Sequence, residues 1–185
     1  MQIILCLLLF FSPAEKKKEI EILPVPFDTV SQSISISKTI AVQPLYNADS
    51  TLDTVYAKDI YLSAMNWFHL NYPSPKKVIQ STFEPDSIIG KYKFRVYYIN
   101  PKTGARNVIK HWIMYDIKIE TYKASYTYTI DNFRTDEATP QHIERWLDKN
   151  NRAKKEYAMY TNQLVEYLNT LEQSIVEKMK LIGSK

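Results

Sequence analysis

The chain has 185 residues, of which 45% are apolar and 24% charged, a balance typical of a globular protein with one substantial core. Its formal net charge of +4 is too small to indicate a nucleic-acid partner by itself. Fourteen tyrosines against three glycines favour a sheet-rich architecture over a loop-rich one.

Residues 1–14, MQIILCLLLFFSPA, are predicted to be a secretory signal peptide. An apolar run is followed by Ser12, Pro13 and Ala14, small residues that suit a signal peptidase. The run is too short to span a bilayer, and a buried N-terminal strand is the alternative interpretation. Cleavage after Ala14 would remove Cys6, and with it disulfides, thiol catalysis and cysteine metal sites. We therefore expect export to the periplasm or the cell surface, with no transmembrane segment in the mature chain.

Residues 15–36 are charged, then proline-containing, then serine-rich, and are expected to form a flexible lead-in. A first strand is predicted at residues 38–42, followed by a helix from about residue 56 to 72. Its apolar side chains recur at helical spacing and are assigned to the core: Ile60, Tyr61, Ala64, Trp67, Phe68 and Tyr72. Pro73 and Pro75 prevent the helix from continuing.

Four extended runs then follow at residues 78–84, 88–99, 108–120 and 125–130, with no helix between them. They should therefore pair as an antiparallel meander. Apolar and polar residues alternate along the longer runs, as expected of strands with one buried and one solvated face. The predicted core face comprises Tyr92, Phe94, Val96, Tyr98, Ile109, His111, Ile113, Tyr115, Ile117, Ile119, Tyr126, Tyr128 and Ile130.

Two helices are expected after the sheet. Thr139 and Pro140 are typical of a helix start, so a short helix is predicted to about Lys149. A longer helix at residues 154–182 has an apolar residue every three or four positions and extends about 40 Å, enough to cross a small sheet. The alternative interpretation is that these apolar residues form a coiled coil on the surface of the protein. The prediction is one α+β domain at residues 37–182, in the order β-α-β4-α, with an antiparallel sheet covered by two helices.

Three stretches carry a resemblance to a known family: KDIYLSAMNWF at Lys58–Phe68, VIQSTFEPDSIIGKYKF at Val78–Phe94, and IKIETYKASYTYTIDNF at Ile117–Phe133. They resemble exported proteins of Gram-negative anaerobes that carry a domain of unknown function with a TBP-like fold. The turn at residues 122–124, Tyr-Lys-Ala, stands where that family usually has a Lys-Asp-Gly type of turn. The resemblance implies the fold and export, and it supplies no catalytic residue.

The residues otherwise offer little chemistry. His69, His111 and His142 lie on different predicted elements without ligand spacing, so no metal site is predicted. The glycines are too scattered for a phosphate loop, and no nucleophile motif is present. Acidic pairs such as Asp116 with Glu120, or Asp131 with the acids at 136 and 137, fall in loops or on the solvated face. We expect a non-enzymatic protein with no catalytic residue, metal or cofactor.

The leading hypothesis is a binding module for an unknown protein or small-molecule partner. The predicted solvated face is basic and aromatic together: Lys91, Lys93, Arg95, Tyr97, Lys110, Trp112, Met114 and Lys118. An ordinary solvated face, on which lysine stems cover apolar area, is the alternative.

A second hypothesis is a carrier of a small apolar ligand, with a pocket between the sheet and the C-terminal helix. Its lining would be Tyr92, Tyr98, Tyr115, Tyr126 and Tyr128, for which a tyrosine-rich core is the alternative role. Nucleic-acid binding is a third hypothesis, suggested by the name of the fold and by the basic face. It is not expected, because of the export signal and because Asp116 and Glu120 share that face.

Overall fold

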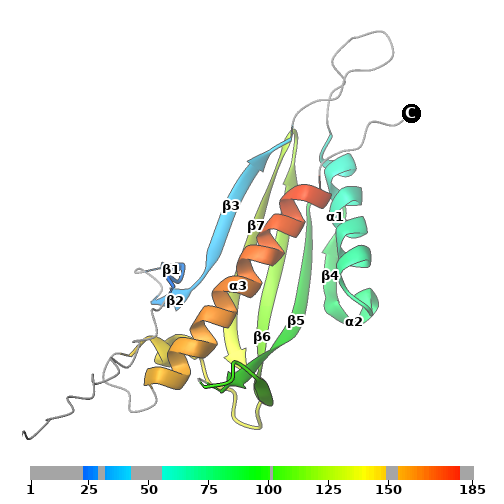
Figure 1. The fold of residues 1–185 in the computed structure, drawn as a ribbon. Helices are drawn as coiled ribbons and strands as arrows, with labels where there is room; N and C mark the ends of the chain where they lie inside the picture. The colour runs from blue at the N-terminus through cyan, green and yellow to red at the C-terminus, as the bar shows by residue number, and fades with distance from the viewer. Residues whose placement is uncertain (1–22, 29–31, 43–55, 101, 149–153, 180–185) are drawn as a thin grey trace, which may run out of the picture.

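The computed structural model describes residues 23–28, 32–42, 56–100, 102–148 and 154–179 (Figure 1). The side chains of residues 107–110 and 154 are not described either. The predicted signal peptide and half of the lead-in lie outside this part. The strands are β1 Phe27–Asp28, β2 Ser33–Ile34, β3 Ile36–Ala41, β4 Ile79–Phe83, β5 Ser87–Ile99, β6 Arg106–Tyr122 and β7 Ser125–Thr135. The helices are α1 Ala57–Asn71, α2 Pro75–Val78, the 3₁₀ helix η1 Ile143–Leu147 and α3 Lys154–Lys178.

The main sheet has five strands in the order β3-β7-β6-β5-β4, all antiparallel, which confirms the predicted α+β architecture and its meander. The first predicted strand, β3, returns to pair with the last one, β7, so β3 and β4 form the two edges. β5 pairs with β6 from Ser87 to Ile99, whereas β4 accompanies β5 only as far as Gly90. β5 therefore extends well past the end of β4, and the side of β5 that faces β4 has no neighbouring strand there.

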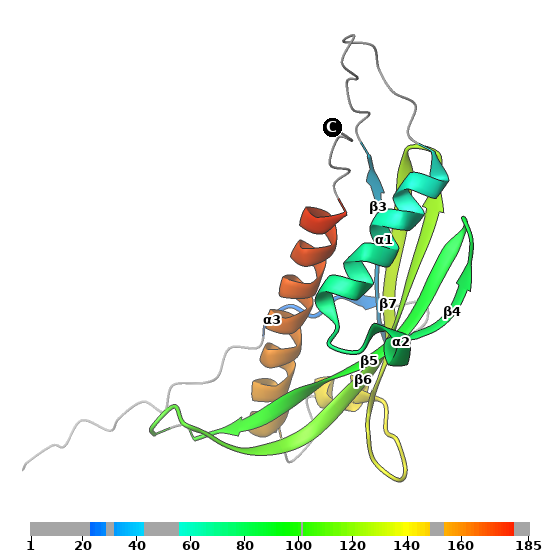
Figure 2. The same cartoon turned by 90° about the vertical axis from the view of Figure 1, so that its right-hand side faces the viewer.

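Both long helices, α1 and α3, lie on the same face of the sheet (Figure 2). The Trp67 indole N–H of α1 donates a hydrogen bond to the Ser174 hydroxyl of α3 at 2.9 Å, which joins the two helices. Beneath them the alternation of β6 is complete from Ile113 to Ile119, whose odd-numbered side chains are fully buried. The opposite face of the sheet is contacted by neither long helix.

The strand predicted at residues 125–130 is longer than expected, and its extension changes the faces. β7 continues to Thr135, and its register against β6 shifts between Met114 and Asp116. Asn132 takes a positive φ of 56°, a conformation that asparagine tolerates better than most residues. The resulting bulge turns Phe133 and Thr135 into the core, although simple alternation would have placed Asn132 there. The prediction that this strand ends at Ile130 is wrong for this reason.

Three other boundaries differ from the sequence predictions. The described part of the expected lead-in holds the short β1–β2 pair, and Ile34 belongs to the core. The helix predicted from Pro140 is only the 3₁₀ helix Ile143–Leu147, because the backbone before it is held extended: the Thr135 N–H donates to the Gln141 carbonyl, and Arg134 bridges to His142. α2 precedes β4, so Pro75 starts a short helix as well as ending the one before it.

Candidate binding face

Most residues of the predicted binding face are gathered on two neighbouring strands. Lys91, Lys93 and Arg95 of β5 are exposed and lie opposite Asp116, Met114 and Trp112 of β6. Lys118 lies further along β6, and Tyr97 is half-buried at the far end of β5. The side chain of Lys110 is outside the described part. We call the set Lys91, Lys93, Arg95, Trp112, Met114 and Lys118 the open face.

Trp112 lies at the centre of the open face, between two cations. The guanidinium carbon of Arg95 is 4.3 Å from the centroid of the indole ring, and the Lys93 ammonium is 4.9 Å from it. Lys93 also pairs with Asp136 at 2.5 Å, and the Asp136 N–H donates to the Trp112 carbonyl at 2.8 Å. The segment after β7 therefore helps to position the tryptophan and its cation–π partners.

The open face is bordered by acidic residues on the side of β7. Asp116 of β6 lies directly opposite Asp131 of β7. Burial, and then the neighbouring Asp116, raise the pKa of the Asp131 carboxyl above its usual value. Arg134 and Lys91 approach Asp116 at 3.5 and 3.9 Å, and the Asn132 amide donates to it at 2.7 Å. Positive charge consequently concentrates toward β5.

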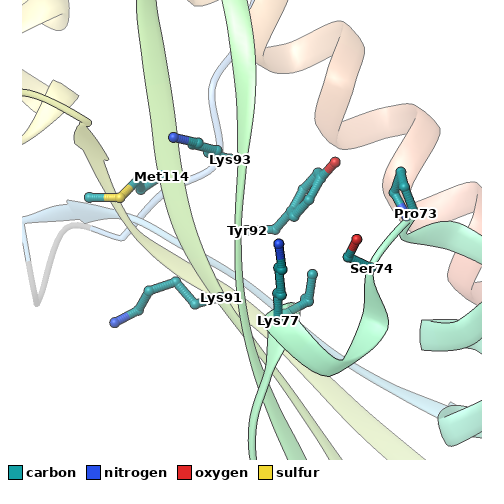
Figure 3. A pocket seen from close by; sticks show the side chains of 8 residues that line it. Pro73, Ser74, Lys77, Lys91, Tyr92, Lys93 and Met114 are labelled. Atoms are coloured by element: carbon teal, nitrogen blue, oxygen red, sulfur yellow. The ribbon is translucent and has the colours of Figure 1, made fainter.

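A groove of about 330 Å³ lies along the edge of β5 where β4 has ended. We call it the edge groove. Its lining comes from the segment around α2 and from the two central strands: Pro73, Ser74, Lys77, Val78, Lys91, Tyr92, Lys93 and Met114. In Figure 3, Tyr92 and Lys77 lie on one side of β5, and Lys91 and Met114 lie on the other. The groove therefore reaches both faces of the sheet around the edge of this strand.

A second groove, of about 530 Å³, continues along β5 toward α3. Phe94 stacks on Tyr167 of α3 with ring centroids 4.1 Å apart, which forms an apolar wall. The Gln163 side-chain amide of α3 accepts a hydrogen bond from the Tyr97 N–H at 3.0 Å and donates one to the Tyr97 carbonyl at 2.9 Å. Sequence reasoning did not single out Lys77 or Gln163. The sequence did carry one signal for these grooves. The first strand predicted in the meander, residues 78–84, is shorter than the second, residues 88–99, so part of the second strand would have no neighbour on that side.

The five tyrosines proposed as the lining of an interior pocket are not gathered around either of the two grooves described above. Tyr115, Tyr126 and Tyr128 are packed in the core, so for these three the alternative role holds. The Tyr115 hydroxyl lies 3.1 Å from that of Tyr72 and 2.7 Å from that of Tyr167. Burial raises the pKa of Tyr115 well above 10.0 and that of Tyr167 to about 12, so these phenols stay neutral. Of the proposed lining, Tyr92 reaches the two grooves instead.

The histidines are spread over the molecule. His111 Nδ1 is 3.0 Å from a Glu137 carboxylate oxygen, His142 Nδ1 is 3.9 Å from Glu144, and His69 is exposed. Within the described ranges, no group of three His, Cys, Asp or Glu side chains is placed to hold a metal ion. No described helix has the length and apolar character needed to cross a membrane.

Comparison with known families agrees with this architecture. Residues 46–136 match the model of a family described as a domain of unknown function (DUF4468) with TBP-like fold. This stretch of the chain is therefore similar to that family. A crystal structure of a DUF4468 family protein from Bacteroides ovatus is similar, with a TM-score of 0.61 and 13% identity over 87% of this chain and 93% of that one. A TBP-like protein from Parabacteroides distasonis gives a TM-score of 0.58 and 14% identity over 80% and 92%. No functionally curated protein matches this chain.

Proposed function

We propose that this protein is an exported, non-enzymatic binding module that holds a partner against its open face. The observation that carries the proposal is the environment of Trp112, a half-buried indole between Lys93 and Arg95 on the face that α1 and α3 leave uncovered. Tryptophan and arginine are the residue types most enriched among the side chains that dominate binding energy at protein interfaces.

The geometry favours binding over simple solvation of the sheet. A surface lysine normally loses side-chain entropy when a partner fixes it. Here Lys93 is already held by the Trp112 ring and by Asp136. A partner that docks on this cluster therefore meets a partly preorganised surface. The signal-like residues 1–14 support export as part of the proposal, and the non-enzymatic role is proposed because the sequence offers no recognisable catalytic motif.

Site-specific photocrosslinking in the native cell envelope tests the proposal. A photoreactive phenylalanine is placed at Lys118, which belongs to the open face, and at Leu62, which is 54% exposed on α1. We expect a discrete crosslinked product from position 118 that disappears in the Trp112→Ala background, and no matching product from position 62.

The matched control is Tyr56→Ala, which removes an aromatic side chain that is 61% exposed at the start of α1. It should leave the crosslink from position 118 intact. Equal crosslinking from both helix and sheet positions, or a product unaffected by Trp112→Ala, would show that the open face is not the binding surface.

A further inference from the structure

The outer edge of β5 has an unused row of backbone hydrogen-bonding groups. β4 pairs with β5 no further than Gly90, but β5 continues to Ile99. The Tyr97 N–H and C=O point to this outer edge, because both are bonded to Gln163. The register of β5 against β6 is regular from Ser87 to Val96, and the shift that follows adds a residue to β6 only. Because successive residues of a strand point their polar groups to opposite sides, Lys91, Lys93 and Arg95 share the direction of Tyr97.

Most of these groups are available for pairing. Within the described part of the chain, the outward backbone groups of Lys93 and Arg95 have no hydrogen-bond partner, whereas the pairing of Ile79 with Gly90 brings the Val78 carbonyl to the Lys91 N–H. Proteins usually cover such an edge, and here Gln163 does so only at Tyr97. The two grooves, of about 330 and 530 Å³, lie beside the remaining stretch of the edge. The two grooves therefore provide space for an extended segment beside the outward N–H and C=O groups of β5.

The side chains around this edge define the chemistry of an occupant. Neighbouring residues of an added strand would point alternately to the two faces of the sheet. On the open face they would meet the cations of Lys91, Lys93 and Arg95. On the other face they would meet Tyr92 and the stacked pair of Phe94 and Tyr167. Charge complementarity thus selects acidic residues on one side, and the aromatic wall selects apolar residues on the other.

We infer that β5 accepts an extended segment of a partner protein, with alternating acidic and apolar side chains, as an additional strand along residues 91–95. This inference rests on the proposed binding function and specifies its partner. Main-chain hydrogen bonds supply affinity in this mode, and the alternate side chains supply specificity.

Three synthetic eight-residue probes test the inference by fluorescence anisotropy against the full mature chain. They are an alternating Glu-Val peptide, the same peptide N-methylated at every second residue on the pairing edge, and an alternating Lys-Val peptide. We expect the Glu-Val peptide to bind, and N-methylation to weaken binding about tenfold or more, because each removed hydrogen bond contributes to affinity. The Lys-Val peptide should bind at least as weakly as the methylated one.

Variants locate the site. Lys91→Glu with Lys93→Glu should abolish binding of the Glu-Val peptide, whereas the matched pair Lys58→Glu with Lys123→Glu, at exposed positions on α1 and in the β6–β7 turn, should reduce it no more than about twofold to threefold. Bound peptide should also slow hydrogen exchange of the Lys93 and Arg95 amides. Because a charge reversal can affect folding, circular dichroism of each variant accompanies the assay, and the N-methyl comparison uses unaltered protein.

The outcomes separate this inference from the broader function. If the methylated peptide binds as tightly as its parent, or if the Lys93 and Arg95 amides gain no protection, strand addition is overturned. The binding function is then still decided by the Trp112-dependent crosslink. If the peptide adds to β5 but no Trp112-dependent crosslink forms in the envelope, the inference stands and the open-face function fails.

Discussion

Replacing Gly90 with alanine tests the contact between α1 and the sheet. Gly90 is buried on β5 beneath Phe68, and an alanine Cβ there would lie 2.6 Å from Phe68 Cε1 and 3.2 Å from Ile117 Cγ2. The Phe68 ring cannot retreat easily, because it is fully buried and packs at centroid distances of 4.9 Å from Trp67 and 5.7 Å from Tyr72. Gly90→Ala therefore forces the helix or the ring to move.

The expected cost follows from two opposing effects. Overpacking a well-filled core costs about 1–3 kcal/mol, while replacing a strand glycine with alanine returns about 0.5–1 kcal/mol of backbone entropy. We expect Gly90→Ala to lower the free energy of unfolding by about 1–2 kcal/mol, which corresponds to a fall in Tm of roughly 3–7 °C for a domain of this size. Urea denaturation followed by circular dichroism measures this difference.

A double-mutant cycle shows whether Phe68 is the cause. Phe68→Leu alone should cost about 1 kcal/mol or more by leaving a cavity, and it should make room for the alanine methyl. The double variant should then be more stable than additivity predicts, by about 1 kcal/mol. Gly104→Ala is the control, because nothing lies within 4 Å of its Cβ and its cost should arise from its φ of 69° alone. An additive cycle, or a stabilising Gly90→Ala, would refute the reasoning.

Further substitutions test the turn, the acidic pair, the tyrosine network and the signal peptide. Ala124 has a φ of 60°, so Ala124→Gly should raise the free energy of unfolding by about 0.5–1 kcal/mol in urea denaturation, and no gain would contradict strain at that turn. Because the pKa of Asp131 is raised in the folded protein, its ionisation destabilises the fold as pH rises from about 4. Asp131→Asn should therefore raise the free energy of unfolding by about 0.2–1 kcal/mol at pH 7, and this gain should disappear near pH 3. An equal gain at both pH values would contradict this. Tyr115→Phe removes two buried hydroxyl contacts and should cost about 1–3 kcal/mol, against little change for the exposed Tyr56→Phe. N-terminal sequencing of the mature protein should begin at Glu15, and an intact Met1 would contradict cleavage.

The sheet and the long helices could be predicted because their periodicities are long and uninterrupted. Alternation through β6 identifies its buried face, and the apolar stripe of α3 identifies a helix along the whole sheet. The bulge at Asn132 could not be predicted in this way. One residue in a positive-φ conformation reverses the faces of everything after it, and alternation carries no signal for such a residue.

The charged and aromatic residues of the open face could be predicted from the sequence, but the edge groove beside β5 could not. Alternation placed Lys93, Arg95 and Trp112 on one face, as found. The edge groove depends on where β4 stops, and its lining includes Lys77, which belongs to a short helix that the sequence did not indicate. The Gln163 contact with Tyr97 joins residues 66 positions apart, so only the docking of α3 brings them together.

The distribution of charge over the open face also favours a narrow partner over a nucleic-acid duplex. A duplex lying across the sheet would place phosphates over Asp116 and Asp131 as well as over the lysines, and burial together with the neighbouring Asp116 already raises the pKa of Asp131. More negative charge there would be repelled, whereas affinity for a duplex depends on neutralising many phosphates. An extended peptide at the β5 edge meets Lys91, Lys93 and Arg95 while lying one strand further from both aspartates. Its binding should therefore weaken with salt only as far as those few ion pairs require, which distinguishes it from the steep salt dependence of a nucleic-acid complex.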